Sequence, residues 1–177
     1  LFGNLKKDRS AMFLEGINTI LKIWSTEAPY KIKGDYWDVT TENTLIEDIG
    51  QGYMTRPLQR PHPPIIVTAV APYSKGISEA AARGWKPISA DIIMPNWVKT
   101  HWEMYVEGCK KGKLIPSKDD WRIAKTVFVA DDLKKAKEYA LGPNSPYVFY
   151  FKQLFKKFVA LGKLELFKSS INQPDSE

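Results

Sequence analysis

An almost unbroken apolar run, Ile65 to Val70, most restricts how this chain can fold. The chain enters the run through a stiff, extended proline cluster made up of Pro57, Pro61, Pro63 and Pro64. Such a run predicts a strand that is buried on both faces, as the strands of parallel sheets are. Two more strands are predicted where apolar and β-branched residues gather, at Trp85–Ser89 and Trp121–Val129.

Helical patterns alternate with these strands. The predicted helices cover about Ala11–Trp24, Gly76–Arg83, Asn96–Lys111, Asp131–Leu141 and Tyr147–Leu161. Asn96 is the expected N-cap of the third helix, because its side chain can accept a backbone hydrogen bond there. The alternation predicts an α/β fold with a parallel sheet and right-handed crossovers.

A single domain is expected to span residues 1–177. Within it, residues 30–60 are expected to form an excursion between larger units, with a short hairpin that turns at Lys33-Gly34-Asp35. Residues 169–177 are polar and are expected to form a loose tail.

Composition excludes several classes of protein. The chain has 177 residues, of which 44% are hydrophobic, so it can bury a core and is not a disordered chain. It has no run of about 18 apolar residues, so no transmembrane helix and no membrane partner are expected. Cys109 is the single cysteine, so no internal disulfide can form, and a reducing, cytoplasmic location is expected. One cysteine and two histidines cannot build an ordinary structural zinc site, so no metal is expected.

The turn after the first strand is the strongest candidate for a binding site. Ligands of α/β folds bind at the carboxyl ends of the strands, and a helix that starts there offers free N–H groups to a phosphate. Tyr73, Ser74, Lys75 and Gly76 occupy this turn. Ser74 can donate a hydroxyl, Lys75 adds charge, and Gly76 lets a ligand approach the backbone. The alternative is an ordinary strand–helix turn capped by a serine.

The end of the second strand, Ser89-Ala90-Asp91, lies at the same edge of the sheet by topology. Small side chains leave space there, and Asp91 could bind a substrate or cap the next segment. His101 follows Trp97 at helical spacing, which is typical of a histidine with structural partners. Cys109 has no activating partner in the sequence, so it is not proposed as a nucleophile.

The chain carries 26 Lys and Arg against 20 Asp and Glu, a net charge of +6. Many of the lysines fall in the last third of the chain: Lys134, Lys135, Lys137, Lys152, Lys156, Lys157, Lys163 and Lys168. One interpretation is a basic domain that binds a polyanion such as nucleic acid without catalysis. The favoured interpretation is a set of solvated helix faces, because Phe151, Phe155 and Phe158 recur at core-like helical spacing, and no nucleic-acid partner is expected.

Several segments together resemble the bacterial luciferase-like flavin monooxygenase family, and within it the limonene and alkanal monooxygenase group. The first half of the resemblance lies in Glu15-Gly16-Ile17-x-x-Ile20-Leu21-x-x-Trp24, Gly34-x-Tyr36-Trp37 and Pro57-Leu58-Gln59-x-Pro61-His62-Pro63-Pro64-Ile65. The second half lies in Ala80-Ala81-x-x-Gly84-Trp85-x-Pro87-Ile88-Ser89, Trp97…Trp102-x-x-Tyr105-x-x-Gly108 and Trp121-Arg122…Phe128-Val129-Ala130-Asp131.

The resemblance implies part of a TIM (β/α)8 barrel, roughly strands five to seven with their helices. A complete barrel needs eight strands and about 250 residues, so the other strands are expected before Leu1 and after Glu177. The catalytic residues stay unknown, because they are expected to lie outside this chain, and the fragment alone is expected to be inactive.

The resemblance also implies an enzyme that uses reduced FMN and O2 to insert one oxygen atom into a small organic substrate, such as an aldehyde or a terpene. A flavin reductase would supply the reduced flavin, and a homodimer is an option because relatives are often dimers. A deazaflavin-dependent oxidoreductase of the same fold is the alternative.

Two sets of site residues follow from the resemblance. The family's turn after the fifth strand binds the flavin phosphate through backbone amides and a small hydroxyl, which corresponds here to Pro72, Tyr73, Ser74, Lys75 and Gly76. The end of the family's next strand lines the flavin and substrate pocket, which corresponds to Ser89 and Ala90. Tyr73 and Lys75 depart from the smaller residues that relatives often have.

Overall fold

The computed structural model describes residues 3–4, 6–170 and 172–173. Where the sequence predicts one domain, contacts divide the chain into two compact units, Leu1–Pro63 (unit 1) and Pro64–Glu177 (unit 2). The division falls inside the proline cluster that precedes the apolar run. Each unit is described by itself below.

Unit 1 is built on helix α1, Arg9–Ser25, which confirms the helix predicted from Ala11 to Trp24. Its first turn is capped by Asp8, whose Oδ1 accepts the N–H groups of Ser10 and Ala11 at 2.9 and 3.1 Å. The apolar side of α1 is partly open, with 57% of Phe13 and 43% of Ile20 exposed.

The predicted hairpin is present, but the tight turn predicted for it is wrong. Strands β1 (Lys31–Ile32) and β2 (Val39–Thr40) pair antiparallel and are joined by six residues, 33–38, rather than by a tight turn. The reason is Glu15 of α1, whose carboxylate accepts the N–H groups of Asp35, Tyr36 and Trp37 at 2.8 to 3.0 Å. Partial desolvation raises the pKa of Glu15, but the three donors outweigh it and lower the pKa overall.

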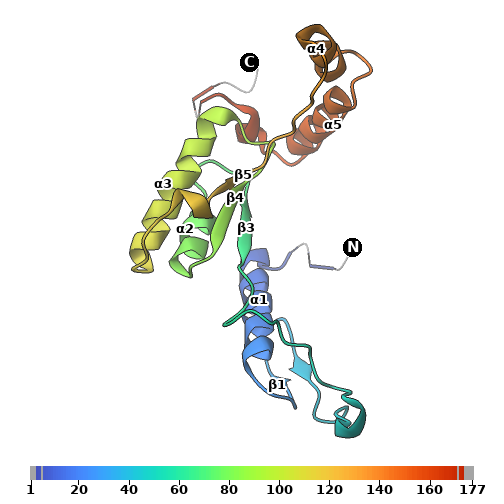
Figure 1. The fold of residues 1–177 in the computed structure, drawn as a ribbon, viewed down its shortest axis with the longest axis vertical. Helices are drawn as coiled ribbons and strands as arrows, with labels where there is room; N and C mark the ends of the chain where they lie inside the picture. Colours follow the sequence, from blue (N-terminus) through green and yellow to red (C-terminus); the bar gives the residue numbers. More distant parts are fainter. Residues whose placement is uncertain (1–2, 5, 171, 174–177) are drawn as a thin grey trace. The chain divides into compact units, whose positions relative to one another are not determined.

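Unit 2 contains the parallel sheet that the sequence predicts. Strands β3 (Ile66–Ala69), β4 (Lys86–Ser89) and β5 (Arg122–Ile123) lie in the order β3-β4-β5, all parallel. Helices α2 (Lys75–Ala82) and α3 (Pro95–Lys111) pack on one face of the strands (Figure 1). The observed order of helices and strands confirms an α/β fold.

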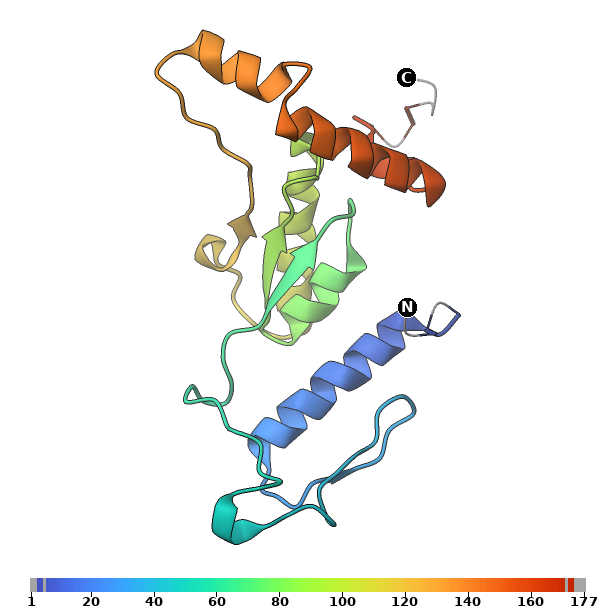
Figure 2. The same ribbon diagram turned by 90° about the vertical axis from the view of Figure 1, so that its right-hand side faces the viewer.

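Two expectations about the strands are wrong. Strand β5 covers two residues instead of Trp121–Val129. The N–H group of Ala124 still donates to the Ser89 carbonyl at 2.9 Å, but the segment then leaves the sheet, and 77% of Val127 is exposed. Strand β3 is not buried on both faces, since 46% of Ile66 is exposed. Within the described residues, helices cover only one face of the sheet, so the other face of β3 is open (Figure 2). No described strand pairs with the outer edge of β5, which explains why β5 is short.

The predicted cap of α3 is also wrong. Met94 is the N-cap, and Pro95 takes the first helical position, which suits a residue without an N–H group. Asn96 instead donates to the Ser169 carbonyl, and the Trp97 indole donates to the Lys168 carbonyl at 2.8 Å. The described part of the predicted loose tail, 169–170 and 172–173, therefore starts against α3, while residues 171 and 174–177 lie outside the described residues.

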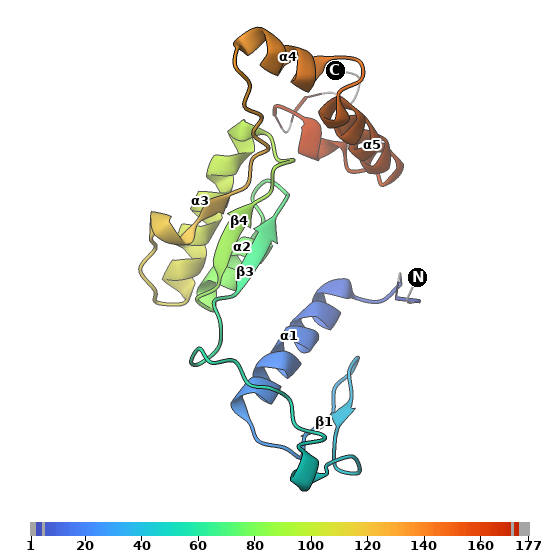
Figure 3. The ribbon, with the colours of Figure 1, turned by 45° about the vertical axis from the view of Figure 1, so that its right-hand side comes forward.

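Helices α4 (Leu133–Leu141) and α5 (Pro146–Ala160) confirm the last two predicted helices (Figure 3). The side chains of Asp132 and Ser145 cap them by accepting the N–H groups of Lys135 and Val148. Short 3₁₀ turns complete the described elements, at Glu47–Ile49, Lys118–Asp120 and Leu164–Phe167. Among the residues described, we find no helix with the length and apolar character needed to cross a bilayer.

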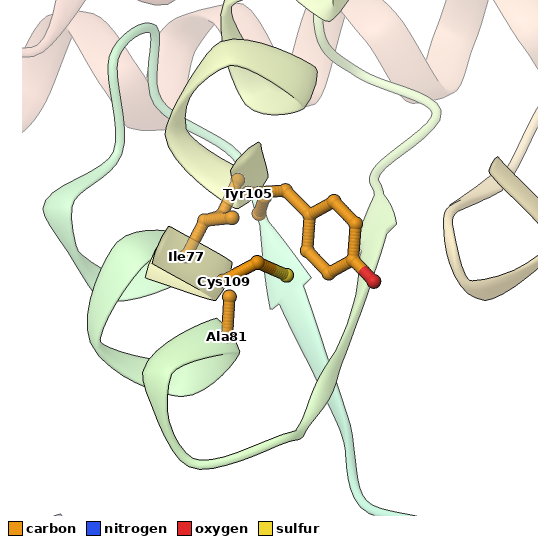
Figure 4. Packing of buried hydrophobic residues seen from close by; sticks show 5 residues of the cluster. Ile77, Ala81, Tyr105 and Cys109 are labelled. Atoms are coloured by element: carbon orange, nitrogen blue, oxygen red, sulfur yellow. The ribbon is translucent and has the colours of Figure 1, made fainter. Parts of the chain in front are cut away.

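The core of unit 2 lies between α2, α3 and β3. Ile77 and Ala81 of α2 meet Tyr105 and Cys109 of α3 (Figure 4), and each of these side chains is at most 3% exposed. The close approach is possible because Gly108 has no side chain: a Cβ there would lie 2.2 Å from the Ser78 carbonyl oxygen.

Gly108→Ala should lower the free energy of unfolding by about 2 kcal/mol, because the added methyl group would force α2 and α3 apart. Alanine is the better helix former, so a gain in stability would contradict this packing. The control is Gly76→Ala, where the new Cβ would meet only the Ser74 hydroxyl at 3.6 Å and should change stability by less than about 0.5 kcal/mol. Urea denaturation followed by circular dichroism measures both.

Candidate functional site

The candidate site is the turn from β3 to α2, at the carboxyl edge of the parallel sheet. Ser74 is the N-cap of α2, and its carbonyl accepts the N–H group of Ile77 at 3.0 Å. The N–H groups of Lys75 and Gly76 lie in the first turn of the helix, where no helical carbonyl precedes them. The positive end of the helix dipole adds to their attraction for an anion.

The side chains around these N–H groups leave the turn accessible. The Ser74 hydroxyl makes no capping hydrogen bond, although serine commonly does so at this position. Gly76 is exposed, and a Cβ placed on it would meet only the Ser74 hydroxyl. Lys75 is exposed too, and its charge is one of the smaller causes that lower the pKa of Glu107, after the dominant hydrogen bond from Lys111.

The remaining two residues of the predicted site, Pro72 and Tyr73, shape the backbone. Tyr73 has a φ of +49°, in the left-handed region that side chains other than glycine rarely adopt. Its N–H group donates to the Thr100 hydroxyl at 3.0 Å. Its ring meets the ring of Trp97 edge to face, with centroids 6.2 Å apart. The conformation of the turn thus depends on helix α3.

Ser89 and His101 form a buried polar chain behind the turn. His101 Nε2 lies 2.9 Å from the Ala71 carbonyl oxygen, which can only accept, so Nε2 carries the proton. Nδ1 therefore accepts from the Ser89 hydroxyl at 2.8 Å, and that oxygen accepts from the Trp121 indole at 2.9 Å. Burial lowers the pKa of His101, more than its backbone hydrogen bond to Ala71 raises it. Both ring nitrogens have partners, which confirms the structural role that the sequence predicts for His101.

The two residues predicted to line a flavin pocket point to different faces. Ser89 is fully buried on the helix-covered face, where His101 and Trp121 occupy its hydroxyl. Ala90 is half-buried, and its N–H group continues the ladder by donating to the Ala69 carbonyl at 2.9 Å. Because side chains alternate along a strand, Ala90 belongs to the uncovered face.

Asp91 has a structural role at the end of β4. Its carboxylate accepts the N–H and hydroxyl groups of Thr126, and its carbonyl accepts from the Lys125 ammonium at 2.9 Å. These contacts join the segment after β4 to the segment after β5. Asp91 therefore does not cap the segment that follows it, as one of the two predicted roles required, and instead holds the segment after β5.

The contribution of Thr100 to this region was missed by sequence reasoning. It is 1% exposed and sits one helical turn after Trp97, a spacing that marks a buried helix face but does not indicate what the hydroxyl binds. Cys109 is buried in the core, in agreement with its exclusion as a nucleophile. Within the described residues, no group of three or more His, Cys, Asp or Glu side chains could hold a metal ion.

Two solved structures with a similar fold are named as monooxygenases. The first is a type II Baeyer–Villiger monooxygenase, the oxygenating constituent of 3,6-diketocamphane monooxygenase from the CAM plasmid of Pseudomonas putida, in complex with FMN. It matches 93% of this chain with a TM-score of 0.71 and 26% identity. The second, monooxygenase RslO1 from Streptomyces bottropensis, has a TM-score of 0.60 over 89% of this chain, and at 20% identity it supports the fold alone.

The sequence itself is similar to that of 3,6-diketocamphane 1,6-monooxygenase of Pseudomonas putida, which is 28% identical over 162 residues. The match covers 88% of this chain and 42% of the relative, so the chain spans less than half the length of the proteins it resembles. No protein-family model matches the chain. The resemblance seen in the sequence is confirmed: the chain is homologous to part of a luciferase-like flavin monooxygenase.

Acidification from pH 7.5 to 5.5 should destabilise the chain through His101. The pKa of the folded histidine is lowered, so the unfolded state binds a proton more readily below its ordinary pKa of 6.5. The free energy of unfolding is therefore highest above pH 6.5 and falls as the pH drops below it. His101→Gln, which cannot titrate, should flatten this dependence. Equal pH dependence in the two proteins, measured by urea denaturation, would contradict the buried neutral ring.

Proposed function

We propose that this chain carries the flavin-phosphate site of a flavin-dependent monooxygenase. The enzyme would use reduced FMN and O2 to insert one oxygen atom into a small organic substrate. The observation that carries the proposal is the β3–α2 turn, where the free N–H groups of Lys75 and Gly76 and the uncommitted Ser74 hydroxyl face an accessible surface. The related enzyme with FMN bound covers nearly the whole of this chain.

The residues of the turn fit a phosphate group. A phosphate monoester carries a charge near −2 and accepts several hydrogen bonds, and the turn offers two backbone donors, one hydroxyl and the Lys75 ammonium. Gly76 leaves room for the anion to approach the backbone, since nothing but the Ser74 hydroxyl lies near its absent Cβ. Pro72 and Tyr73 would set the backbone direction rather than contact the phosphate through their side chains.

The task of this chain is binding and orientation, while FMN supplies the redox chemistry when bound. A phosphate fixed at the end of β3 would place the rest of the flavin along the carboxyl edge of the sheet, near half-buried Ala90. Ser89 would support the pocket from behind, because its hydroxyl is committed to His101 and Trp121. No catalytic residue is assigned to this chain.

The uncovered face of the sheet is what three strands of a larger barrel would show when the other strands are absent. Ile66 and Ile123 are about half exposed, and β3 and β5 both have open edges among the described residues. In a TIM barrel, further strands would close these edges and bury such side chains. We therefore propose that β3, β4 and β5 are strands five to seven of that barrel.

The partners follow from the same proposal. A flavin reductase would supply reduced FMN, and a homodimer is an assembly open to the complete protein. The buried thiol of Cys109 has no disulfide partner, which is compatible with work in the cytoplasm.

Two alternatives remain separable by experiment. A deazaflavin-dependent oxidoreductase of this fold would bind a reduced deazaflavin cofactor in preference to FMN. A polyanion-binding domain would bind nucleic acid with an affinity that falls linearly on a log–log plot against salt. The aromatic residues beside its lysines pack on each other, as Phe155 and Phe158 do on Phe167, which favours a structural surface over a stacking platform.

Ser74→Ala should weaken FMN binding about tenfold, because the phosphate loses a hydroxyl donor. Riboflavin, which has the same ring system without the phosphate, should bind the variant and the unaltered protein with affinities within about twofold. Quenching of flavin fluorescence in the full protein measures both dissociation constants.

The control variant is Ser78→Ala, because Ser78 lies on the same helix and is hydrogen-bonded to Glu107 and Lys111 instead. It should leave the ratio of FMN to riboflavin affinity unchanged. If Ser74→Ala also leaves this ratio unchanged, the phosphate does not bind at Ser74 and the proposed site is wrong.

A further inference from the structure

We propose that Thr100 and His101, neighbours on α3, are positioning residues that hold the β3–α2 turn in its phosphate-binding conformation before any ligand binds. The inference rests on the proposed function, because it concerns how the phosphate site keeps its shape. Neither residue is itself assigned a contact with the phosphate.

The two α3 side chains hold the turn on both sides of Pro72. His101 Nε2 donates to the carbonyl before the proline, that of Ala71, at 2.9 Å. The Thr100 hydroxyl oxygen accepts the N–H group after the proline, that of Tyr73, at 3.0 Å. Pro72 has no N–H group and a fixed φ, so these two bonds fix the polar backbone atoms that flank it.

The turn needs this external support because its conformation is unfavourable by itself. Tyr73 is an aromatic residue with a φ of +49°, where glycine would be the ordinary choice. A residue persists in such a conformation only when its surroundings impose it. Here the surroundings are the Thr100 hydrogen bond and the edge-to-face contact with Trp97. Tyr73 immediately precedes Ser74, so its backbone angles set where the hydroxyl and the first N–H groups of α2 point.

Thr100 and His101 are themselves fixed by buried hydrogen bonds. The Thr100 hydroxyl donates to the Trp97 carbonyl at 2.7 Å while it accepts from Tyr73. The other ring nitrogen of His101 accepts from Ser89 of β4. Both side chains are at most 1% exposed, so water cannot easily replace these partners. A fully satisfied buried network of this kind is rigid.

A turn that is already in its binding conformation does not have to be ordered when the ligand arrives, which favours affinity. Loosening the turn should therefore lower the affinity for a ligand whose phosphate group binds there. The same change should leave contacts with the flavin ring unaffected, because those come from elsewhere along the sheet edge.

The test compares Thr100→Val, which keeps the shape of the side chain and removes its hydroxyl, with Thr100→Ser, which keeps the hydroxyl. In the full protein, Thr100→Val should weaken FMN about tenfold and riboflavin by less than about twofold. Thr100→Ser should bind both within about twofold of the unaltered protein.

A merely structural role for Thr100 predicts a different result, namely equal weakening of both flavins by Thr100→Val, and that result would overturn the proposal. If the unaltered protein fails to bind FMN more tightly than riboflavin, the phosphate site itself is wrong and the inference falls with it. The two failures are thus distinguishable.

A measurement without any substitution guards against a variant that does not fold. In the ligand-free protein, the amide hydrogen of Tyr73 should exchange with solvent about 100-fold more slowly than in an unstructured chain, because Thr100 already holds it. An unprotected Tyr73 amide that becomes protected only when FMN is added would overturn the proposal.

Discussion

The close packing of α3 on α2 is the contact on which unit 2 depends. Gly108 of α3 and Gly112, the C-cap after it, make this packing possible. A Cβ on Gly108 would lie 2.2 Å from the Ser78 carbonyl oxygen, and one on Gly112 would lie 2.4 Å from that of Ala82. Because α3 also contacts β4, a wider spacing of the two helices would displace α3 from the sheet. The position of every α3 side chain near the candidate site follows from this constraint.

Buried hydrogen bonds extend that constraint to the edge of the sheet. The chain from Trp121 through Ser89 and His101 to the Ala71 carbonyl contains no charged group, and each donor in it meets an acceptor. It connects the approach to β5, the end of β4, helix α3 and the β3–α2 turn. The β3–α2 turn is therefore held by buried hydrogen bonds that reach it from β4 and α3.

Local patterns predicted most of the elements, because strands and helices of this kind are encoded by neighbouring residues. Strand β4 and helix α4 lie within two residues of their predicted bounds. The errors arise where distant residues decide the structure. Glu15 holds the hairpin loop from 20 or more positions away, and β5 is short because strand length depends on a pairing partner rather than on sequence alone.

The candidate site divides in the same way. Topology placed Ser74 to Gly76 at the carboxyl edge of the sheet without knowledge of any side-chain contact. The sequence could not reveal that Thr100 contacts Tyr73 or that His101 contacts Ala71, because 27 and 30 positions separate these pairs. Ser89 and Ala90 show a further limit. Neighbouring residues of a strand point to opposite faces of the sheet, so the Ser89 hydroxyl faces the helices while Ala90 faces the open side, and the sequence did not separate the two.

A crystal structure of the full protein with FMN bound tests the central claim most directly. The account predicts phosphate oxygens within about 3.2 Å of the Ser74 hydroxyl and of the backbone nitrogens of Lys75 and Gly76, with Tyr73 still in its left-handed conformation. A phosphate bound elsewhere, with the β3–α2 turn free of ligand contacts, would contradict it.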